Sequence, residues 1–403
     1  MKTGSFTPLP LFYAARNIGR SPLRLVLTAA GGALVVFLVV GAMASVRALD
    51  RGVRASGTPG NVLIVGAGSE ESVERSEIPA GAPGVLAASI EGIRSLAGTA
   101  FVSPELHVPL PMRREGDPAP EGSARSLALV RGVEPAAFLV HPQARLATGR
   151  LPDAGADEII VGRALAAQLR ITDADIGIGA ATLPIVLIDE NPHRVTGIID
   201  APGVAIDGEA WMPIADLLVL TKRQTISAAV VSLDGADVGD IEAFAARRSD
   251  LELAAIDEPA YYAQLAAFFR PVQILIGMSA LVVALGAMLG GLNALDAAFA
   301  SRSREIAMLQ VLGYSRGAII LSLMQESILA VAIGALPALL VARILLDGAG
   351  VRFSMGIFSL SVDATCVATG LAAGVALGVV GSLPPAIRCL RASIPSALKA
   401  DLV

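Results

Sequence analysis

Histidines and grouped carboxylates are the side chains here that could most readily carry out chemistry, yet their spacing matches no catalytic or metal-binding motif. The histidines His107, His141 and His193 are scattered through stretches that resemble loops, so we interpret each as a solvated loop residue rather than a metal ligand. The sequence has no Cys/His cluster that could bind zinc. Five carboxylates are likewise interpreted as ordinary surface residues: Asp153, Asp157, Glu158, Asp189 and Glu190. We predict no catalytic residue and no metal site.

An ATP-binding motif is also missing from the sequence. A P-loop requires the pattern GxxxxGK[ST], in which the lysine reaches the nucleotide phosphates. The only lysines are Lys2, Lys222 and Lys399, and none of them occurs in that pattern. The chain is therefore not expected to be an enzyme, and no cofactor is expected to bind to it.

The segment 301–326, SRSREIAMLQVLGYSRGAIILSLMQE, has a charge pattern that suggests a specific role. Three charged residues open it, and three apolar residues follow at helical spacing before a glycine: Arg302, Arg304, Glu305, Ile306, Leu309, Leu312 and Gly313. Arg316 then adds a positive charge, and an apolar run begins. A short amphipathic helix of this kind, placed between two membrane spans, would offer a docking surface to a soluble partner.

The composition indicates a membrane protein. Of the 403 residues, 54% are hydrophobic and only 17% are charged, whereas an ordinary soluble domain has about 25% charged residues. Four stretches exceed the ~20 apolar residues needed to cross a bilayer: Leu25–Val46, Val272–Leu295, Ala318–Ala342 and Ala364–Ile387. The first is too long for the apolar core of a signal peptide. We predict four transmembrane helices.

Basic residues near the spans indicate the orientation of the chain. They gather in the N-terminal segment, the loop between the second and third spans, and the C-terminal segment: Lys2, Arg16, Arg20, Arg24, Arg302, Arg304, Arg316, Arg388, Arg391 and Lys399. With four spans these three segments share one side, which the positive-inside rule makes cytoplasmic. The segment 47–270 has 19 basic and 30 acidic residues, a net charge of −11, and is expected outside.

We therefore expect an α-helical membrane protein with a large extracytoplasmic α+β domain inserted between its first two transmembrane helices. Residues 1–47 would hold a cytoplasmic amphipathic helix, for which a disordered basic tail is the alternative, and the first transmembrane helix. Residues 48–270 would form the extracytoplasmic domain. Residues 271–403 would carry the other three transmembrane helices and a cytoplasmic coupling helix at about 301–313.

Short β-branched runs alternate with short helical runs in the extracytoplasmic domain, which is the pattern of an α+β fold. A β-rich subdomain is predicted at about 145–220. A helix is predicted over Gly84–Leu96, and the proline- and glycine-rich stretch Pro109–Gly122 is predicted to be an exposed loop.

Glycines recur at four-residue spacing in two of the spans: Gly286 and Gly290 in the second, and Gly370, Gly374 and Gly378 in the fourth. Small residues at this spacing let helices approach closely in lipid. Packing within one chain and contact between two copies are both compatible with the pattern.

The spans contain no central pair of charged residues, which argues against a transporter driven by protons or ions. Glu326 lies about two turns into the third span. It could reach the cytoplasmic interface or pair with Arg302 or Arg304.

The order of these parts resembles the permease subunits of ABC transporters of the MacB/FtsX/LolC type, the mechanotransmission family. These permeases have one span, a large extracytoplasmic domain and three further spans. The stretch RSREIAMLQVLGYSRGAIILSLMQES is similar to their C-terminal signature, which it matches at Arg304, Glu305, Ile306, Leu309, Gly313 and Glu326. A basic residue often follows the leucine, but Gln310 stands there in this chain. The stretch YAARNIGRSPLRLVLTAAGGAL resembles the family's N-terminal helix and first span.

The resemblance implies a permease in a bacterial inner membrane, multi-pass, with both termini in the cytoplasm. A separate cytoplasmic ATPase would bind ATP and Mg and dock on the coupling residues, which are Arg302, Arg304, Glu305, Ile306, Leu309, Gly313, Arg316 and Glu326. Further expected partners are a second permease copy in a homodimer or related heterodimer, a periplasmic adaptor and membrane lipid, but no nucleic acid. The implied function is export or extrusion of a lipid, lipoprotein, peptide or drug-like substrate. The alternative is an FtsX-like regulator of cell-wall hydrolases that moves no substrate.

Overall fold

The structure is a computed structural model that describes residues 9, 11–18, 22–117, 127–177, 182–353 and 356–391. Lys2, Arg20, Lys399 and the last residues of the predicted loop at 109–122 lie outside these ranges. The chain divides into two compact units. One consists of residues 1–46, 271–349 and 360–403 and is called the helical unit below; the other consists of 47–270 and 350–359 and is called the sheet unit.

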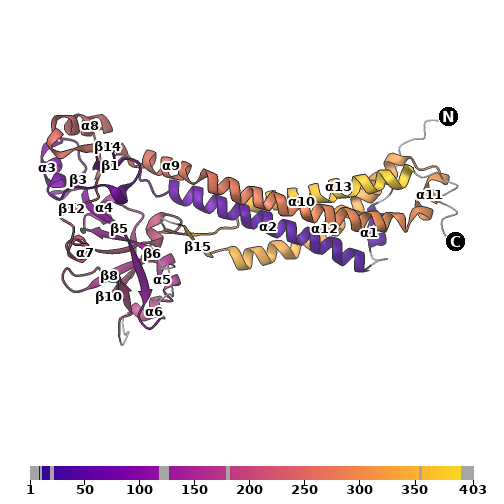
Figure 1. The fold of residues 1–403 in the computed structure, drawn as a ribbon, viewed down its shortest axis with the longest axis horizontal. Helices are drawn as coiled ribbons and strands as arrows, with labels where there is room; N and C mark the ends of the chain where they lie inside the picture. The colour runs from indigo at the N-terminus through magenta and orange to yellow at the C-terminus, as the bar shows by residue number, and fades with distance from the viewer. Residues whose placement is uncertain are drawn as a thin grey trace. The chain divides into compact units, whose positions relative to one another are not determined.

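The helical unit is built mainly from four long apolar helices (Figure 1). The helices that contribute to it are α1 (Leu11–Ile18), α2 (Pro22–Arg54), α10 (Arg270–Ala300), α11 (Ser303–Val311), α12 (Arg316–Leu346) and α13 (Ala364–Arg391). In α2, α10, α12 and α13 the length and composition suffice to cross a membrane. Each predicted span lies inside one of these helices, although each helix is longer than its span.

Glycines let three of the long helices approach one another closely. A side chain at Gly334 of α12 would collide with the backbone of Ala29 in α2, and one at Gly32 of α2 would meet Val331 of α12. Backbones that come this near are held by van der Waals packing, which is the main attraction between helices in lipid. These two glycines therefore mark positions where α2 and α12 lie close together.

The sheet unit contains a ten-stranded sheet in the order β14-β1-β13-β5-β6-β11-β8-β10-β7, with β9 paired to both β10 and β5. Its strands are β1 (Asn61–Gly66), β5 (Val102–Arg114), β6 (Leu127–Val133), β7 (Arg145–Gly149), β8 (Glu158–Gly162), β9 (Ile185–Ile188), β10 (Asn191–Asp200), β11 (Ala210–Pro213), β13 (Ala228–Ser232) and β14 (Leu253–Asp257). The pairs β6–β11 and β8–β10 are parallel, and the other neighbours are antiparallel.

Short elements complete the sheet unit. The smaller strands are β2 (Ile78–Pro79), β3 (Ser95–Leu96), β4 (Thr99–Ala100) and β12 (Thr225–Ile226). The α-helices are α3 (Ala82–Ser89), α4 (Ala137–Val140), α5 (Arg163–Gln168), α6 (Asp173–Ile176), α7 (Ile214–Thr221), α8 (Val238–Arg247) and α9 (Glu258–Phe268), and the 3-10 helices are η1 (Val73–Arg75), η2 (Ala205–Gly208) and η3 (Ser249–Leu251). A hairpin from the connection between α12 and α13, β15 (Gly350–Phe353) with β16 (Gly356–Ser359), also belongs to this unit.

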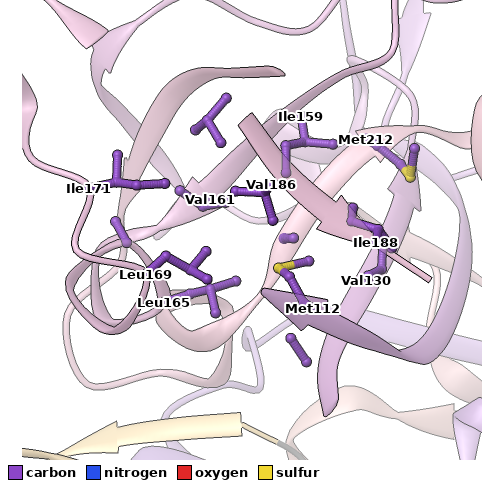
Figure 2. Packing of buried hydrophobic residues seen from close by; sticks show 14 of the residues in the cluster. Met112, Val130, Ile159, Val161, Leu165, Leu169, Ile171, Val186, Ile188 and Met212 are labelled. Carbon is purple, nitrogen blue, oxygen red and sulfur yellow. The ribbon is translucent and has the colours of Figure 1, made fainter. Parts of the chain in front are cut away.

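Several apolar cores lie in the described part of the sheet unit, and two of them pack toward opposite ends of the sheet. One core packs residues of α5 and α7 against β5, β6 and β8–β11, and includes Met112, Val161, Leu165 and Ile188 (Figure 2). The other packs α3 and α8 against β1 and β13. The predicted β-rich region at about 145–220 supplies most of the first core, but β5, β6 and β11 continue the sheet from one core to the other.

Two sequence predictions for this unit are wrong over part of their length. The stretch Pro109–Gly122 was predicted to be a loop, but its residues up to Arg114 belong to strand β5. Pro109 and Pro111 pair there with β6. On its other side β5 pairs with β13 only up to Glu105 and with β9 only from Met112. The two prolines lie between these limits, where no second strand requires a backbone N–H donor. The predicted helix Gly84–Leu96 ends at Ser89, and β3 follows.

Candidate functional site

The predicted coupling segment folds as α11 and the turn that leads into α12. Ile306 and Ala307 are buried on one face of α11, and Leu309 is partly buried beside them. Ile306 and Leu309 join a single apolar cluster with Leu9 and residues of three other helices: Leu295, Phe299, Ile319, Leu323, Ala386 and Leu390. One core therefore connects the N-terminal segment, α10, α11, α12 and α13.

The opposite face of α11 remains exposed. Arg304 is exposed, and so are three apolar side chains, Met308 at 47%, Val311 at 66% and Leu312 at 74%. Leu312 was predicted to continue the helical spacing of Ile306 and Leu309, but it lies after the last residue of the helix and is not part of the shared core. Exposed apolar side chains beside an arginine are typical of a protein interface.

A glycine and a serine set the direction in which the chain leaves α11. Gly313 has a φ of +95°, a conformation that residues with a Cβ rarely adopt. The Ser315 hydroxyl then accepts a hydrogen bond from the backbone N–H of Ala318 at 3.2 Å and caps the N-terminus of α12. Arg316, at the first position of α12, is exposed.

An ion pair joins α11 to α12. The Arg302 guanidinium donates to the Glu326 carboxylate, with Nη1 at 3.0 and 3.2 Å from its two oxygens, and its Nε donates to Glu305 at 3.1 Å. Glu326 is buried, while the Glu305 side chain is 40% exposed. Of the two pairings considered for Glu326, the structure has the one with Arg302. At the same end of this unit, Arg388 of α13 bonds Asp296 of α10 at 2.7 Å.

The two glycine groups have different surroundings. Side chains at Gly370 and Gly374 would meet Val40 and Val36 of α2, and one at Gly378 would meet Ile328 of α12, so the glycines of α13 face neighbours in the same chain. At Gly286 and Gly290 of α10 a side chain would meet no described atom within 4 Å.

The interpretation of the three histidines as solvated loop residues is wrong. His107, His141 and His193 are each at most 7% exposed. His107 lies in β5, two residues after Glu105, and residues two apart project from the same face of a strand. Glu209 and Trp211 repeat this spacing at β11. These two polar pairs, each set in apolar sequence, were the available signal for a buried polar cluster.

Arg131 of β6 is the centre of that cluster. Its guanidinium donates to Glu105 at 3.0 Å and to Glu209 at 2.6 Å. All three residues are at most 2% exposed. Glu209 also accepts a hydrogen bond from the Trp211 indole at 2.8 Å, and the Arg131 guanidinium lies 5.5 Å from the centre of that ring. Glu105 and Glu209 thus balance a buried cation at the strands that connect the two cores.

The histidines and a further glutamate extend this network. Glu105 lies 2.9 Å from Nε2 of His107 and 2.7 Å from Nε2 of His141. Nδ1 of His141 faces Glu258, the first residue of α9, at 3.8 Å. Burial disfavours the charged form of Glu105, but the positive charges of His141 and Arg131 outweigh it and hold the pKa of Glu105 well below its usual value.

Glu158 was grouped with surface carboxylates, and this too is wrong. It is 3% exposed and pairs with Arg150, whose Nη2 lies 2.6 Å from Oε1. The hydrogen bond from Arg150 lowers the pKa of Glu158 despite its burial. The other four carboxylates of those groups are exposed, as predicted. Within the described residues no cluster of three potential metal ligands occurs.

Comparisons with known proteins place both units. Residues 25–247 match the family profile described as MacB-like periplasmic core domain, and residues 277–394 match the one described as FtsX-like permease C-terminal. No curated protein sequence matches the chain.

Two solved structures are similar to part of the chain. The periplasmic region of MacB from Actinobacillus actinomycetemcomitans is 12% identical, with a TM-score of 0.38, over 53% of this chain and 95% of that one. The extracellular domain of the noncanonic ABC-type transporter YknZ from Gram-positive bacteria is 13% identical, with a TM-score of 0.34, over 49% of this chain and 99% of that one.

Proposed function

Because the chain belongs to the family of MacB/FtsX-like ABC transporter permeases, we propose that it is a permease subunit driven by a separate cytoplasmic ATPase. The observation that carries this proposal is the exposed face of α11, where Arg304 lies beside Met308, Val311 and Leu312. The ATPase docks on this face and on Arg316. The chain itself hydrolyses no ATP, since its sequence has no P-loop.

The contacts of α11 suggest how force leaves the docking face. Ile306 transmits it through the shared apolar cluster, and Arg302 transmits it to α12 through Glu326. Packed side chains resist deformation, so a displaced helix carries its neighbours with it. From α12 the motion reaches α2 and α13 at the close glycine contacts.

The proposed location is the bacterial inner membrane, with both termini in the cytoplasm and the sheet unit outside. The basic flanks of the spans and the net charge of −11 over residues 47–270 support this orientation. The movement serves export or extrusion of a lipid, lipoprotein, peptide or drug-like substrate, together with a periplasmic adaptor. An FtsX-like regulator of cell-wall hydrolases is the alternative, and the size of the sheet unit favours export.

A second permease copy is proposed to contact α10. The most apolar stretch of α10 has no buried residue in the single chain. Gly286 and Gly290 leave room there for a neighbouring helix. Replacing both glycines by leucine should convert dimers to monomers when the purified permease is sized in nanodiscs. Gly277→Leu, a change at another open position of the same helix, is the control. Unchanged dimers in the double variant would place the contact elsewhere.

The ATPase partner can be tested by purifying the tagged chain from its native membrane. An ABC ATPase should be recovered in stoichiometric amount. Recovery of the chain alone under conditions that preserve other inner-membrane complexes would contradict the proposal. A recovered cell-wall hydrolase, in place of an adaptor, would favour the regulator.

A further inference from the structure

The buried network reaches the first turn of α9 through a single histidine. His141 follows α4 and lies between two carboxylates, with Nε2 at 2.7 Å from Glu105 of β5 and Nδ1 at 3.8 Å from Glu258 of α9. The shorter distance is a hydrogen bond, and the longer one exceeds hydrogen-bonding range. The side chain of His141 is 1% exposed, and Nδ1 has no hydrogen-bond partner among the described residues.

The other oxygen of Glu258 is held independently of His141. Oε2 accepts a hydrogen bond from the backbone N–H of Thr58 at 3.1 Å and another from Asn61 at 2.8 Å. This fixes the carboxylate at the place where the chain enters β1. Only Oε1 faces the imidazole, so the charge of that ring decides whether the contact is attractive.

The charged and titratable groups of the network around His141 lie on β5, β6 and α9 and beside β11. Glu105 and His107 lie in β5, Arg131 in β6, Glu209 beside β11, and Glu258 and Tyr262 in α9. Arg131 is already bonded to Glu105 and Glu209. The two ring nitrogens of His141 face one carboxylate each, Glu105 and Glu258.

We propose that His141 and Glu258 form a proton-operated link between the central strands of the sheet unit and the N-terminus of α9. With His141 protonated, both ring nitrogens are N–H donors, one to Glu105 and one toward Glu258. When the proton leaves, it leaves Nδ1, because Nε2 keeps its hydrogen to donate to Glu105. A lone pair then faces the Glu258 carboxylate, and the link becomes repulsive.

A cavity at the two carboxylates and the local charge both support a pKa of His141 that is raised. A cavity of about 40 Å³ is lined by Glu105, Glu258 and Tyr262, which is room for a few water molecules. Burial opposes the charge on His141, but the charge and hydrogen bond of Glu105 outweigh it and raise the pKa of His141 above 6.5. Burial also raises the pKa of Glu258.

The position of the link gives it a consequence. Glu258 begins α9, which ends at Phe268, and the transmembrane helix α10 begins at Arg270. A change at Glu258 therefore acts on the segment that leads directly into a membrane span. All residues of the link lie in the sheet unit, and the link requires no ATPase partner.

Trp211 provides a direct readout in the intact protein. It is the only tryptophan of the chain, and its ring centre lies 6.2 Å from that of His141. Because an imidazolium quenches a nearby indole more strongly than a neutral imidazole does, fluorescence of the full chain in nanodiscs should rise in one transition above pH 6.5. Hydrogen exchange of the α9 amides, corrected for the intrinsic effect of pH, should accelerate over the same range.

Variants separate this link from other histidines. His141→Gln keeps a donor for Glu105 but cannot titrate, and both transitions should be lost. His193→Gln replaces a buried histidine whose Nδ1 lies 3.0 Å from the Asn191 carbonyl oxygen, and both transitions should persist. If His141→Gln does not fold, Glu258→Gln serves, and its transition should shift to lower pH. A transition that survives His141→Gln, or is unmoved by Glu258→Gln, would overturn the proposal.

Discussion

Each unit of the protein contains an arginine that bridges two glutamates, and the two bridges differ in how much of them solvent reaches. In the sheet unit Arg131 bonds Glu105 and Glu209, and all three side chains are at most 2% exposed. In the helical unit Arg302 bonds Glu326 and Glu305, whose side chains are 5% and 40% exposed. One bridge is sealed inside a domain, and the other has one end at the surface.

The difference indicates different roles. A sealed bridge is costly to break, because each group left behind is a buried charge without its partner. It therefore holds β5, β6 and β11 in a fixed arrangement. A bridge that ends at the surface can respond to what binds there, since Glu305 is beside the exposed Arg304. We interpret the Arg131 bridge as structural and the Arg302 bridge as part of the coupling path.

The largest effect is expected from Arg131→Met. Leaving Glu105 and Glu209 without their cation should lower the free energy of unfolding of the sheet unit by about 3–5 kcal/mol. Chemical denaturation followed by Trp211 fluorescence would measure it. The matched control is Arg163→Met, because Arg163 is 44% exposed and bonds Asp173 and Asp200 at the surface. There the loss should stay within about 1 kcal/mol. Equal losses in both variants would remove the distinction between sealed and exposed pairs.

Glu326→Gln should have a smaller effect, and a different one. Loss of the charged hydrogen bond to Arg302 should weaken the connection between α11 and α12 by about 1.5–3 kcal/mol, a factor of roughly ten or more in an equilibrium. ATP turnover by the complex should fall, while the Trp211 unfolding transition stays in place. A normal turnover in this variant would exclude the Arg302 bridge from the coupling path.

The pH dependence of stability should separate the two bridges further. The folded pKa of His141 is raised, so its stabilisation is complete below 6.5 and is lost as pH rises through the folded value. The pKa of Glu258 is also raised in the folded protein, so its contribution to stability likewise falls as pH rises. The folded pKa of His107 is lowered, so His107 destabilises the fold as pH falls below 6.5. The Arg302 bridge contains no histidine. The midpoint of thermal unfolding, followed by Trp211 fluorescence, should fall between pH 6 and 9. In His141→Gln the midpoint should depend less on pH. A midpoint that rises with pH would contradict these signs.

Glu305→Gln is expected to change least. The Glu305 side chain is 40% exposed, and a solvent-exposed ion pair contributes only about 0.2–1 kcal/mol. Thermal unfolding of the permease should be nearly unchanged, in contrast to Arg131→Met. A loss comparable to that of Arg131→Met would show that Glu305 is as sealed from solvent as Glu105.

The four long helices of the helical unit could be predicted from the sequence because long apolar runs are local signals. The amphipathic pattern of α11 is also local, and so is the spacing of Gly370, Gly374 and Gly378. No local signal tells which glycines face a neighbour in the same chain, because that depends on how α2, α12 and α13 pack.

The buried network could not be predicted in the same way. Glu105, Arg131, His141, Glu209 and Glu258 lie far apart in the sequence, and they meet only once β5, β6 and β11 are neighbours in the sheet. The two-residue spacing of Glu105 and His107 can be read from the sequence. It places both side chains on one face of a strand only if the segment is already known to be a strand. Pro109 and Pro111 concealed that strand, because prolines usually mark loops.

The central claim is that a partner ATPase docks on the exposed face of α11 and drives the permease through it. The most direct test is to reverse the charges on that face and measure complex formation and ATP turnover. The variant is Arg304→Glu with Glu305→Arg. The control exchanges another pair at the same end of the helical unit, Asp296→Arg with Arg388→Asp, which leaves the net charge and the ion pair in place. We predict that the first exchange abolishes stimulated turnover and complex formation and that the second preserves both. Full turnover and an intact complex after the first exchange would contradict the account.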